Sequence, residues 1–568
     1  MMRVISTVII WVMFLGVKAQ QTTDIHSIIQ DYESYLDRQN DKLNLSWPQN
    51  SQADKDLEHK QLQSIIKQLD ALDQRSFQNQ DLINYELLQL ILNDKIDNLI
   101  YNAHYFPLNA EGGFITGMMY STKNLKLKSE EAADDYVSKL GDTKRYVDQQ
   151  ITWMTKGLDE GKAMPKLVAS NCISILENAI INKLDFLRNP LQSDYLTDSD
   201  KAEAISLIDG DITESFSRLL TFLRKDYLRR APEAVGASQM KEGKEFYEQR
   251  VRYYTTLDMT PQEVYDVGLS EVDRIKGEME WIINDLKYQG DFKDFITFLR
   301  EDPQFYAETP QELLNHAAWL SMKAQEILPK YFARLPRLPF TVNPVPAAIA
   351  PTYTTGRYSG GSMESSKAGE YWVNTYNLPA RPMYVLPALT LHEAVPGHHL
   401  QISLAKEIKD LPRFRTTQYL SAFGEGWGLY AEYLGKEAGI YTTPYEEFGR
   451  LTYEMWRACR LVIDPGIHYF GWTREQAVDY MASNTSLSLH EVNTEIDRYI
   501  GWPGQAVSYK IGELKIRELR KRAEDKLGDD FDIKAFHDLI LSYGSIPLST
   551  LERIVDGYIE EVSRNQGH

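Results

Sequence analysis

The chain has 568 residues, of which 43% are hydrophobic and 25% are charged, and its formal net charge is −19. These proportions are typical of globular proteins and exclude a collagen-like, a largely disordered or a multi-span membrane protein. The acidic balance argues against nucleic-acid binding, which normally requires a basic face. The two cysteines, Cys172 and Cys459, exclude a disulfide-rich scaffold and a four-cysteine zinc site.

Residues 1–19 predict a signal peptide. Arg3 precedes a short apolar run, and Ala19 is a small residue suited to cleavage before Gln20. The run is shorter than the roughly 20 residues that span a bilayer, so we expect no stable membrane insertion. No cysteine lies at the cleavage site, and a lipoprotein anchor is not expected. The prediction is an exported protein, periplasmic or secreted, with an uncleaved anchor as the alternative.

The region 20–334 has a mostly helical pattern, with apolar residues recurring every three or four positions. Three Thr-Pro-x-Glu segments begin at Thr260, Thr309 and Thr443. In such a segment the threonine caps the first free amides, the proline needs no amide hydrogen, and the glutamate reaches back to the cap. Each segment therefore predicts the start of a helix.

The pattern changes at Leu335. Prolines cluster between residues 336 and 351 and exclude a continuous helix, and Glu370–Thr375 is typical of a short strand. Helical periodicity resumes after Pro387. The sequence thus predicts a mainly α fold, with a helical N-terminal region (20–334) and a catalytic region (335–568) that contains a small sheet. We expect the N-terminal helices to wall a deep central cleft.

The segment HEAVPGHH, residues 392–399, contains a His-Glu pair and two further histidines. It is similar to the HExxH motif, in which two histidines one helical turn apart bind zinc and the glutamate is the general base, here Glu393. The spacing is too long for a regular helix. At about 100° per residue His398 lies about 120° around the helix from His392, and His399 lies about 10.5 Å further along it.

Pro396 offers a solution to this spacing. Its ring clashes with the carbonyl group of His392, so the helix must kink or bulge here. If Val395 and Pro396 loop out, the remaining residues restore the HExxH register. His392 and His398 are then the expected metal ligands, and His399 is the alternative second ligand or a hydrogen-bond donor to a ligand.

The segment FGEGWGLYAEY, residues 423–433, provides the third ligand. A zinc site with two histidines needs one more protein ligand and leaves a fourth position for water. Glu425 suits this role on a helix that returns toward the first, because its flanking glycines let helices approach closely. Glu432, on the same face, is the alternative ligand or a partner for a ligand histidine. We expect one Zn²⁺ per chain.

Three segments, HEAVPGHHLQ, GEGWGLYAEYL and WPGQAVSYKIGEL, resemble those of the bacterial family catalogued as domain of unknown function 885, over roughly Phe340 to Glu513. That family in turn resembles the gluzincin metallopeptidases. The resemblance implies a gluzincin-like helical fold, a zinc-dependent peptidase, and Tyr509 or His468 as the donor that stabilises the oxyanion. The sequence departs from the wider clan by its two-residue insertion within HExxH.

Two further segments are candidates for substrate binding. Tyr371–Thr375 precedes the zinc helix and is expected to be an edge strand to which an extended peptide adds, with Asn374 as a contact. The alternative for this segment is a hairpin strand without a substrate role. Arg498 could bind a substrate carboxylate through two parallel hydrogen bonds, and a structural salt bridge is its alternative.

The expected function is zinc-dependent hydrolysis of short peptides. Two alternatives remain at this point: a zinc amidohydrolase acting on a non-peptide amide or cell-wall fragment, and a non-catalytic exported binding protein. The presence of Glu393 weighs against the second, because a binding protein has no use for a general base. The oligomeric state is left open.

Overall fold

A computed structural model of the chain describes residues 24–123, 125–347 and 349–566. The segment predicted as a signal peptide lies outside these residues. The described part is mainly helical and contains one small sheet, as the sequence predicts. None of its helices combines the length and the apolar sequence that a bilayer span requires.

The α-helices that precede the sheet are α1 (Ile25–Leu45), α2 (Gln52–Asp70), α3 (Asn79–Ile100), α4 (Phe114–Thr122), α5 (Glu130–Gly141), α6 (Thr143–Glu160), α7 (Lys166–Ile181), α8 (Asp185–Arg188), α9 (Asp198–Leu207), α10 (Thr213–Phe222), α11 (Leu228–Arg230), α12 (Gly243–Thr255), α13 (Pro261–Asp285), α14 (Phe292–Glu301) and α15 (Pro310–Tyr331). Those that follow it are α16 (Leu386–Glu393), α17 (His398–Glu407), α18 (Arg413–Thr417), α19 (Ser421–Glu437), α20 (Pro444–His468), α21 (Arg474–Asn484), α22 (Leu489–Ile500), α23 (Ser508–Leu527), α24 (Ile533–Leu541) and α25 (Leu548–Gln566).

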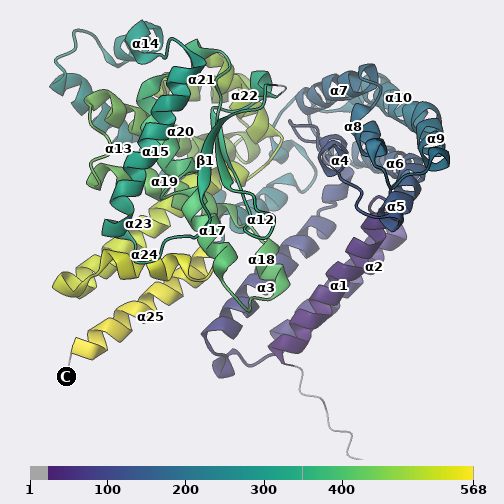
Figure 1. Cartoon of the computed structure of the whole chain (residues 1–568), viewed down its shortest axis with the longest axis horizontal. Coiled ribbons are helices and arrows are strands. Elements are labelled where there is room, and N and C mark those ends of the chain that lie inside the picture. The colour runs from purple at the N-terminus through teal and green to yellow at the C-terminus, as the bar shows by residue number, and fades with distance from the viewer. Residues whose placement is uncertain (1–23, 124, 348, 567–568) are drawn as a thin grey trace, which may run out of the picture.

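Helices α4–α10 gather at one end of the longest axis, whereas α13, α14, α20, α23 and α25 lie toward the other (Figure 1). Two hydrophobic clusters fill the interior. One joins Val147 and Phe216 to Val462, and the other joins Leu88 to Trp427. Each cluster combines residues from before and after Leu335, so the two segments of the chain share their cores.

All three predicted helix starts are confirmed. The side chains of Thr260, Thr309 and Thr443 accept hydrogen bonds from the amides three residues later, at the starts of α13, α15 and α20. At Thr260 and Thr443 the glutamate also accepts a hydrogen bond from the amide of the cap, which completes a reciprocal capping box.

The sheet has three strands, β1 (Phe340–Pro344), β2 (Gly356–Ser359) and β3 (Gly369–Val373), in the order β1-β3-β2. β3 pairs in parallel with β1 and antiparallel with β2. The prediction that the segment from Tyr371 is an edge strand is therefore wrong, because β3 has a neighbour on each side. The sequence pattern finds the strand but does not show how the flanking loops fold back on it.

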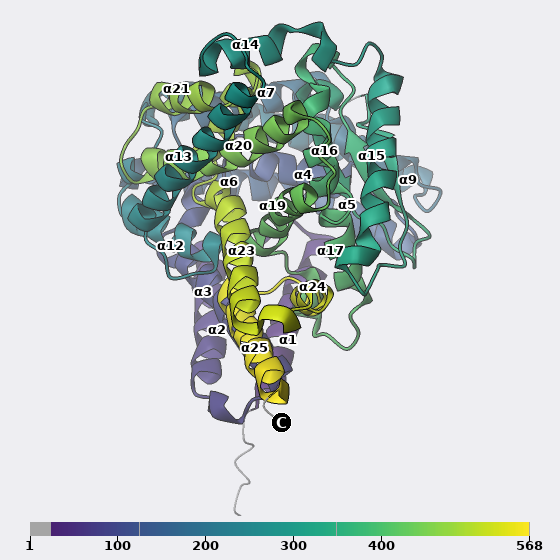
Figure 2. The same ribbon diagram turned by 90° about the vertical axis from the view of Figure 1, so that its left-hand side faces the viewer.

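Helices α19 and α23 approach closely and fix the position of the glutamate-bearing helix. Figure 2 shows α23 crossing in front of α19. A Cβ atom at Gly426 would lie 2.6 Å from the backbone of Gly512, so any side chain there would force the two helices apart. This contact confirms the expectation that glycines beside Glu425 serve close helix packing.

Candidate metal centre

The chain leaves the helical path where Pro396 predicts that it should. α16 ends at Glu393 and α17 begins at His398. Across the break, the amide of Gly397 donates to the carbonyl group of Leu391 at 2.9 Å. A Cβ atom at Gly397 would lie 1.9 Å from the carbonyl oxygen of His392, so the tight turn admits only glycine.

This break brings His392, His398 and Glu425 together. The Nε2 atoms of both histidines lie 3.4 Å from Oε2 of Glu425, and all three ligand atoms lie within 4.8 Å of one another. In a tetrahedral zinc site with bonds of about 2.0–2.1 Å, neighbouring ligand atoms lie about 3.3–3.4 Å apart. The spacing of these side chains therefore fits a zinc ion.

His399 points to the sheet instead. Its Nδ1 atom lies 3.0 Å from the hydroxyl group of Tyr358, and its ring packs against Phe340 with the ring centres 4.6 Å apart. Burial lowers the pKa of His399 to about 4. Of the two histidines that the sequence leaves open, the structure thus places His398 with His392 and Glu425.

Glu432 holds the first histidine. Its Oε1 atom lies 2.7 Å from Nδ1 of His392, which leaves Nε2 of that ring to face Glu425. A carboxylate on the far nitrogen orients a histidine ligand and raises its basicity. The ring lies against Gly428, where a Cβ atom would come within 2.6 Å of it. Glu432 is therefore a partner of a candidate ligand, which is one of its two predicted roles.

The charges of the cluster stabilise one another. Burial alone would lower the pKa of His392, but hydrogen bonds with Glu425 and Glu432 raise it to about 9. Burial would raise the pKa of Glu425, but His398 and His392 hold it well below its ordinary value. In addition, Nδ1 of His398 is buried and has no hydrogen-bond partner among the described residues.

Tyr419 completes the environment of Glu425. Its hydroxyl group donates to Oε1 of Glu425 at 2.9 Å, on the oxygen that does not face the histidines. Burial and then the Glu425 carboxylate raise the pKa of Tyr419 well above its ordinary value, so it remains a donor. Nothing in the sequence distinguishes Tyr419 among 34 tyrosines, and only the fold reveals this contact.

Glu393, the candidate base, faces strand β2. Its buried carboxylate accepts a hydrogen bond from the amide of Tyr358 at 2.7 Å. This amide donates to Glu393 and not to a carbonyl group of β3. Because β2 pairs only with β3 in the sheet, its outer edge faces the carboxylate next to His392.

Tyr509 lies close enough to Tyr419 to influence its pKa. Tyr509 is half-buried at the start of α23, and its ring lies over the guanidinium group of Arg460 at 4.3 Å. It also contributes to the raised pKa of Tyr419, after burial and Glu425. Its position is thus compatible with the predicted role as an oxyanion donor.

His468 has a different environment from the one predicted. Its Nδ1 atom accepts a hydrogen bond from the amide of Ala237 at 3.1 Å, and its Nε2 atom lies 3.0 Å from the carbonyl oxygen of Tyr499. It also lies about 16 Å further along α20 than Arg457, the residue of that helix that approaches Glu432. Both ring nitrogens hold the backbone, so the prediction of an oxyanion donor is corrected to a structural role.

The two predicted substrate-binding residues also have their polar groups engaged by other parts of the protein. Asn374 is fully buried, and its amide group donates to three carbonyl groups of the loop before β2. Its carbonyl oxygen accepts from the amide of Tyr376. Arg498 pairs with Glu495 at 3.2 Å and donates to Gln505 at 2.6 Å. Asn374 thus fixes a loop, and Arg498 forms the structural salt bridge that was the alternative.

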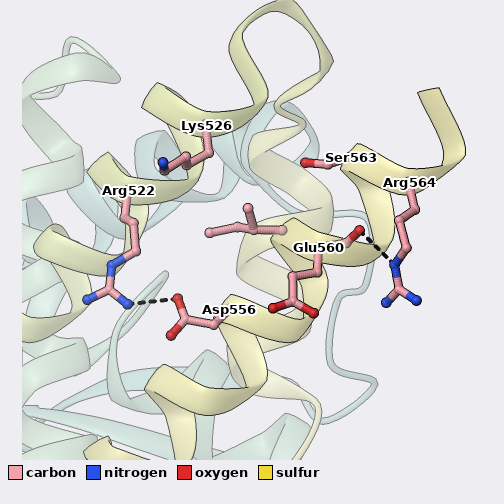
Figure 3. A pocket seen from close by; sticks show the side chains of 7 residues that line it. Arg522, Lys526, Asp556, Glu560, Ser563 and Arg564 are labelled. Carbon is pink, nitrogen blue, oxygen red and sulfur yellow. Dashed lines mark hydrogen bonds and ion pairs between the residues drawn. The ribbon is translucent and has the colours of Figure 1, made fainter. Parts of the chain in front are cut away.

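A surface hollow of about 590 Å³ lies between α23 and α25 (Figure 3). Two of its arginines have partners within it: Arg522 pairs with Asp556 at 2.7 Å, and Arg564 donates to the backbone carbonyl group of Glu560 at 3.2 Å. None of the residues that line it belongs to the metal cluster. The deep cleft expected beside the candidate centre stays a prediction.

Comparison with solved structures identifies the same fold in other bacteria. The structure described as "the putative lipoprotein from Colwellia psychrerythraea" is 26% identical, with a TM-score of 0.86 over 94% of this chain and 99% of that chain. A second, described as "a putative lipoprotein of unknown function from Shewanella oneidensis", shares the fold at 18% identity, with a TM-score of 0.78 and the same coverage. A comparison with curated proteins gives no match. The family described as "Bacterial protein of unknown function (DUF885)" matches residues 33–555, and the chain belongs to this family.

Proposed function

We propose that the protein is a zinc-dependent peptidase that hydrolyses short peptides, with His392, His398 and Glu425 as the metal ligands. The observation that carries the proposal is the convergence of three ligand atoms at the spacing of a tetrahedral zinc shell. Two imidazoles and one carboxylate suit zinc better than calcium or magnesium, which prefer oxygen ligands. Zinc in such a site polarises a carbonyl group and lowers the pKa of water.

Glu393 is the proposed general base. It directly follows His392, and the amide of Tyr358 orients its carboxylate. A carboxylate in this position can take a proton from water and deliver it to the leaving amine. The pairing of a base with a metal cluster favours a hydrolase over the alternative of a non-catalytic binding protein.

Three further residues would support the reaction. Glu432 orients His392, and Tyr419 orients Glu425, so both ligands keep fixed positions. Tyr509 is the proposed donor to the oxygen that gains negative charge in the transition state. A well-placed hydrogen bond to this oxygen lowers the free energy of the transition state and so increases the rate.

The burial of the cluster supports short peptides as substrates. The side chains of His392 and Glu425 are 4% and 16% exposed, so the surface of a folded protein cannot reach them. An extended peptide can add to the outer edge of β2, beside Glu393, and this edge replaces the β3 segment that the sequence suggested. A zinc amidohydrolase would use the same groups, and a substrate screen separates the two functions.

Export is part of the proposal. The predicted signal peptide, with cleavage before Gln20, supports it. The related structures from Colwellia and Shewanella are described as those of putative lipoproteins, which are exported proteins.

Metal analysis of the purified protein, combined with mass spectrometry of a digested peptide library, tests the proposal. We expect one zinc per chain and cleavage of peptides shorter than about 15 residues. Folded proteins offered as substrates should remain uncleaved. Chelation should abolish cleavage, and added zinc should restore it. Protein without bound zinc, or cleavage that survives chelation, would contradict the proposal. Cleavage of non-peptide amides alone would favour the amidohydrolase.

A further inference from the structure

Arginine side chains gather beside the candidate metal centre from both sides of the site. They come from β2, from the segment before α16, and from α20 and α22: Arg357, Arg381, Arg457, Arg460 and Arg498. The carboxylates that interact with them include Glu491 and Glu495 of α22, together with Glu393 and Asp464. Glu432 also approaches Arg457, at 3.6 Å, but it is hydrogen-bonded to His392.

Each of the two α22 carboxylates in this cluster is shared between arginine side chains. Glu495 pairs with both Arg460, at 3.1 Å, and Arg498, at 3.2 Å. Glu491 accepts a hydrogen bond from Thr355, to which Arg381 also donates. One carboxylate thus serves two guanidinium groups.

Two buried arginines retain unused donors. Nε of Arg457 and Nη1 of Arg460 have no hydrogen-bond partner among the described residues. These residues are only 5% and 3% exposed, and their guanidinium groups lie over the ring of Trp456 at 4.4 and 4.5 Å. Unsatisfied donors on buried charges are costly, and such groups usually mark a strained or ligand-binding position.

Arg357 is the accessible member of the cluster. It is exposed on β2 and, in the part of the chain that the structure describes, forms no ion pair. Burial of its guanidinium group lowers the pKa of Arg357, while Tyr353, Glu393 and Tyr509 raise it more strongly. The amide of the next residue, Tyr358, donates to Glu393 at 2.7 Å, so Arg357 lies on the part of β2 that contacts the candidate base.

A carboxylate is the ligand that fits this arrangement best. The guanidinium fork matches the two oxygens of a carboxylate and binds them through parallel hydrogen bonds. Arg498, the anchor suggested by the sequence, is excluded from this role because its donors serve Glu495 and Gln505. Arg357 is hydrogen-bonded to Tyr353 but has no carboxylate partner among the described residues, and it lies on the strand that faces Glu393.

We propose that Arg357 binds a carboxylate of the peptide substrate, either the C-terminal carboxylate or an acidic side chain. This inference rests on the proposed peptidase function and names its substrate class. Among short peptides, those with a negative charge near the scissile bond bind in preference to neutral ones.

The test measures binding in the absence of turnover, with the zinc-loaded Glu393→Gln variant and isothermal titration calorimetry. Three probes differ only in charge: a four-residue alanine-phenylalanine peptide with a free C-terminus, the same peptide as a C-terminal amide, and the amide with one alanine replaced by glutamate. We expect a charged probe to bind at least about tenfold more tightly than the neutral amide, as for a charge-assisted hydrogen bond. Adding Arg357→Gln should remove this preference.

Arg337→Gln is the matched control, because Arg337 is an exposed arginine paired with Glu407 at 3.6 Å and has no place in the cluster. It should leave the preference unchanged. Zinc content and the unfolding temperature show that each variant is folded. Tighter binding of the free peptide assigns the C-terminal carboxylate, and tighter binding of the glutamate probe assigns an acidic side chain.

Several results would overturn the inference. These are equal binding of the three probes, no binding of any probe, a preference that survives Arg357→Gln, and an equal loss for all three probes in that variant. The last result would indicate a general structural role. If the charged probes bind in preference but the wild-type protein cleaves no peptide, the peptidase function fails and the carboxylate site stands.

Discussion

Two buried clusters of charged side chains lie in this fold, and they differ in how their charge is balanced. In one, Nζ of Lys510 lies 3.0, 2.8 and 2.5 Å from the carboxylates of Glu271, Glu454 and Glu513. Burial alone would lower the pKa of Lys510, but the three carboxylates raise it. This cluster, which joins α13, α20 and α23, contains its own cation.

The candidate metal centre is arranged differently. His392 and His398 turn their Nε2 atoms to one oxygen of Glu425, and Glu432 occupies the other nitrogen of His392. These groups are the ligands that we propose for a cation that the protein does not itself provide. The comparison shows that burial and charge are shared by structural and functional sites, and that the direction of the ligand atoms distinguishes them.

The largest expected effect tests which histidine belongs to the metal cluster. His398→Ala should lose nearly all bound zinc, and turnover with it, because two ligands alone hold the metal weakly. His399→Ala is the adjacent control and should keep its zinc, since its ring contacts Tyr358 and Phe340. Metal analysis of both purified variants gives the answer. Greater zinc loss from the His399 variant would show that the ligands are misassigned.

The next effect separates chemistry from metal binding. Glu393→Gln should retain one zinc per chain, because none of the three ligands changes. Its turnover should fall by about 10²–10⁴-fold, which is the usual contribution of a positioned general base. Steady-state kinetics on a cleaved library peptide measures this. A zinc-loaded variant with nearly normal turnover would remove Glu393 from the mechanism.

The third effect concerns the cluster that contains its own cation. Lys510→Met removes the fully buried lysine from three carboxylates, which keep their ion pairs with Arg274, Arg450 and Arg517. The free energy of unfolding should therefore fall by about 3 kcal/mol, the lower end of the range for a broken buried ion pair. Denaturant titration should show the same loss with zinc and after chelation. Lys515→Met, on the same helix in a more exposed pair with Glu518, should cost less than about 1 kcal/mol. A loss seen only in the zinc-loaded protein would mean that the two clusters are not independent.

The smallest effect concerns the carboxylate behind the first ligand. Glu432→Gln should weaken zinc binding by about 10–100-fold, because His392 loses the charge that orients it and increases its basicity. Competition with a chelator measures the affinity. Glu437→Gln, on the same helix but paired with Arg520, is the control. Equal affinities in the two variants would contradict the role given to Glu432.

The sequence predicts features that depend on local stereochemistry. The clash of the Pro396 ring with the preceding turn predicts the break that brings His398 into place, and the capping threonines predict where α13, α15 and α20 begin. Glycine spacing also indicates the close packing around Glu425.

Features that depend on residues distant in the chain could not be predicted from the sequence. Asn374 and His468 are polar residues near plausible motifs, but backbone groups from remote segments satisfy them. Tyr419 and Arg357 gain their places only because a loop and an edge strand fold against α16 and α19. The position of β3 in the sheet likewise depends on pairing that no single strand encodes.

Gly428 has a consequence for other members of the family. A Cβ atom there would lie 2.6–2.8 Å from three atoms of the His392 ring, so alanine would push the first imidazole away from Glu425. A relative with a side chain at this position would therefore keep every candidate ligand and still lose the proposed metal site. Sorting family sequences by the residue that aligns with Gly428 would divide chains that can hold a metal from chains that preserve only its signature.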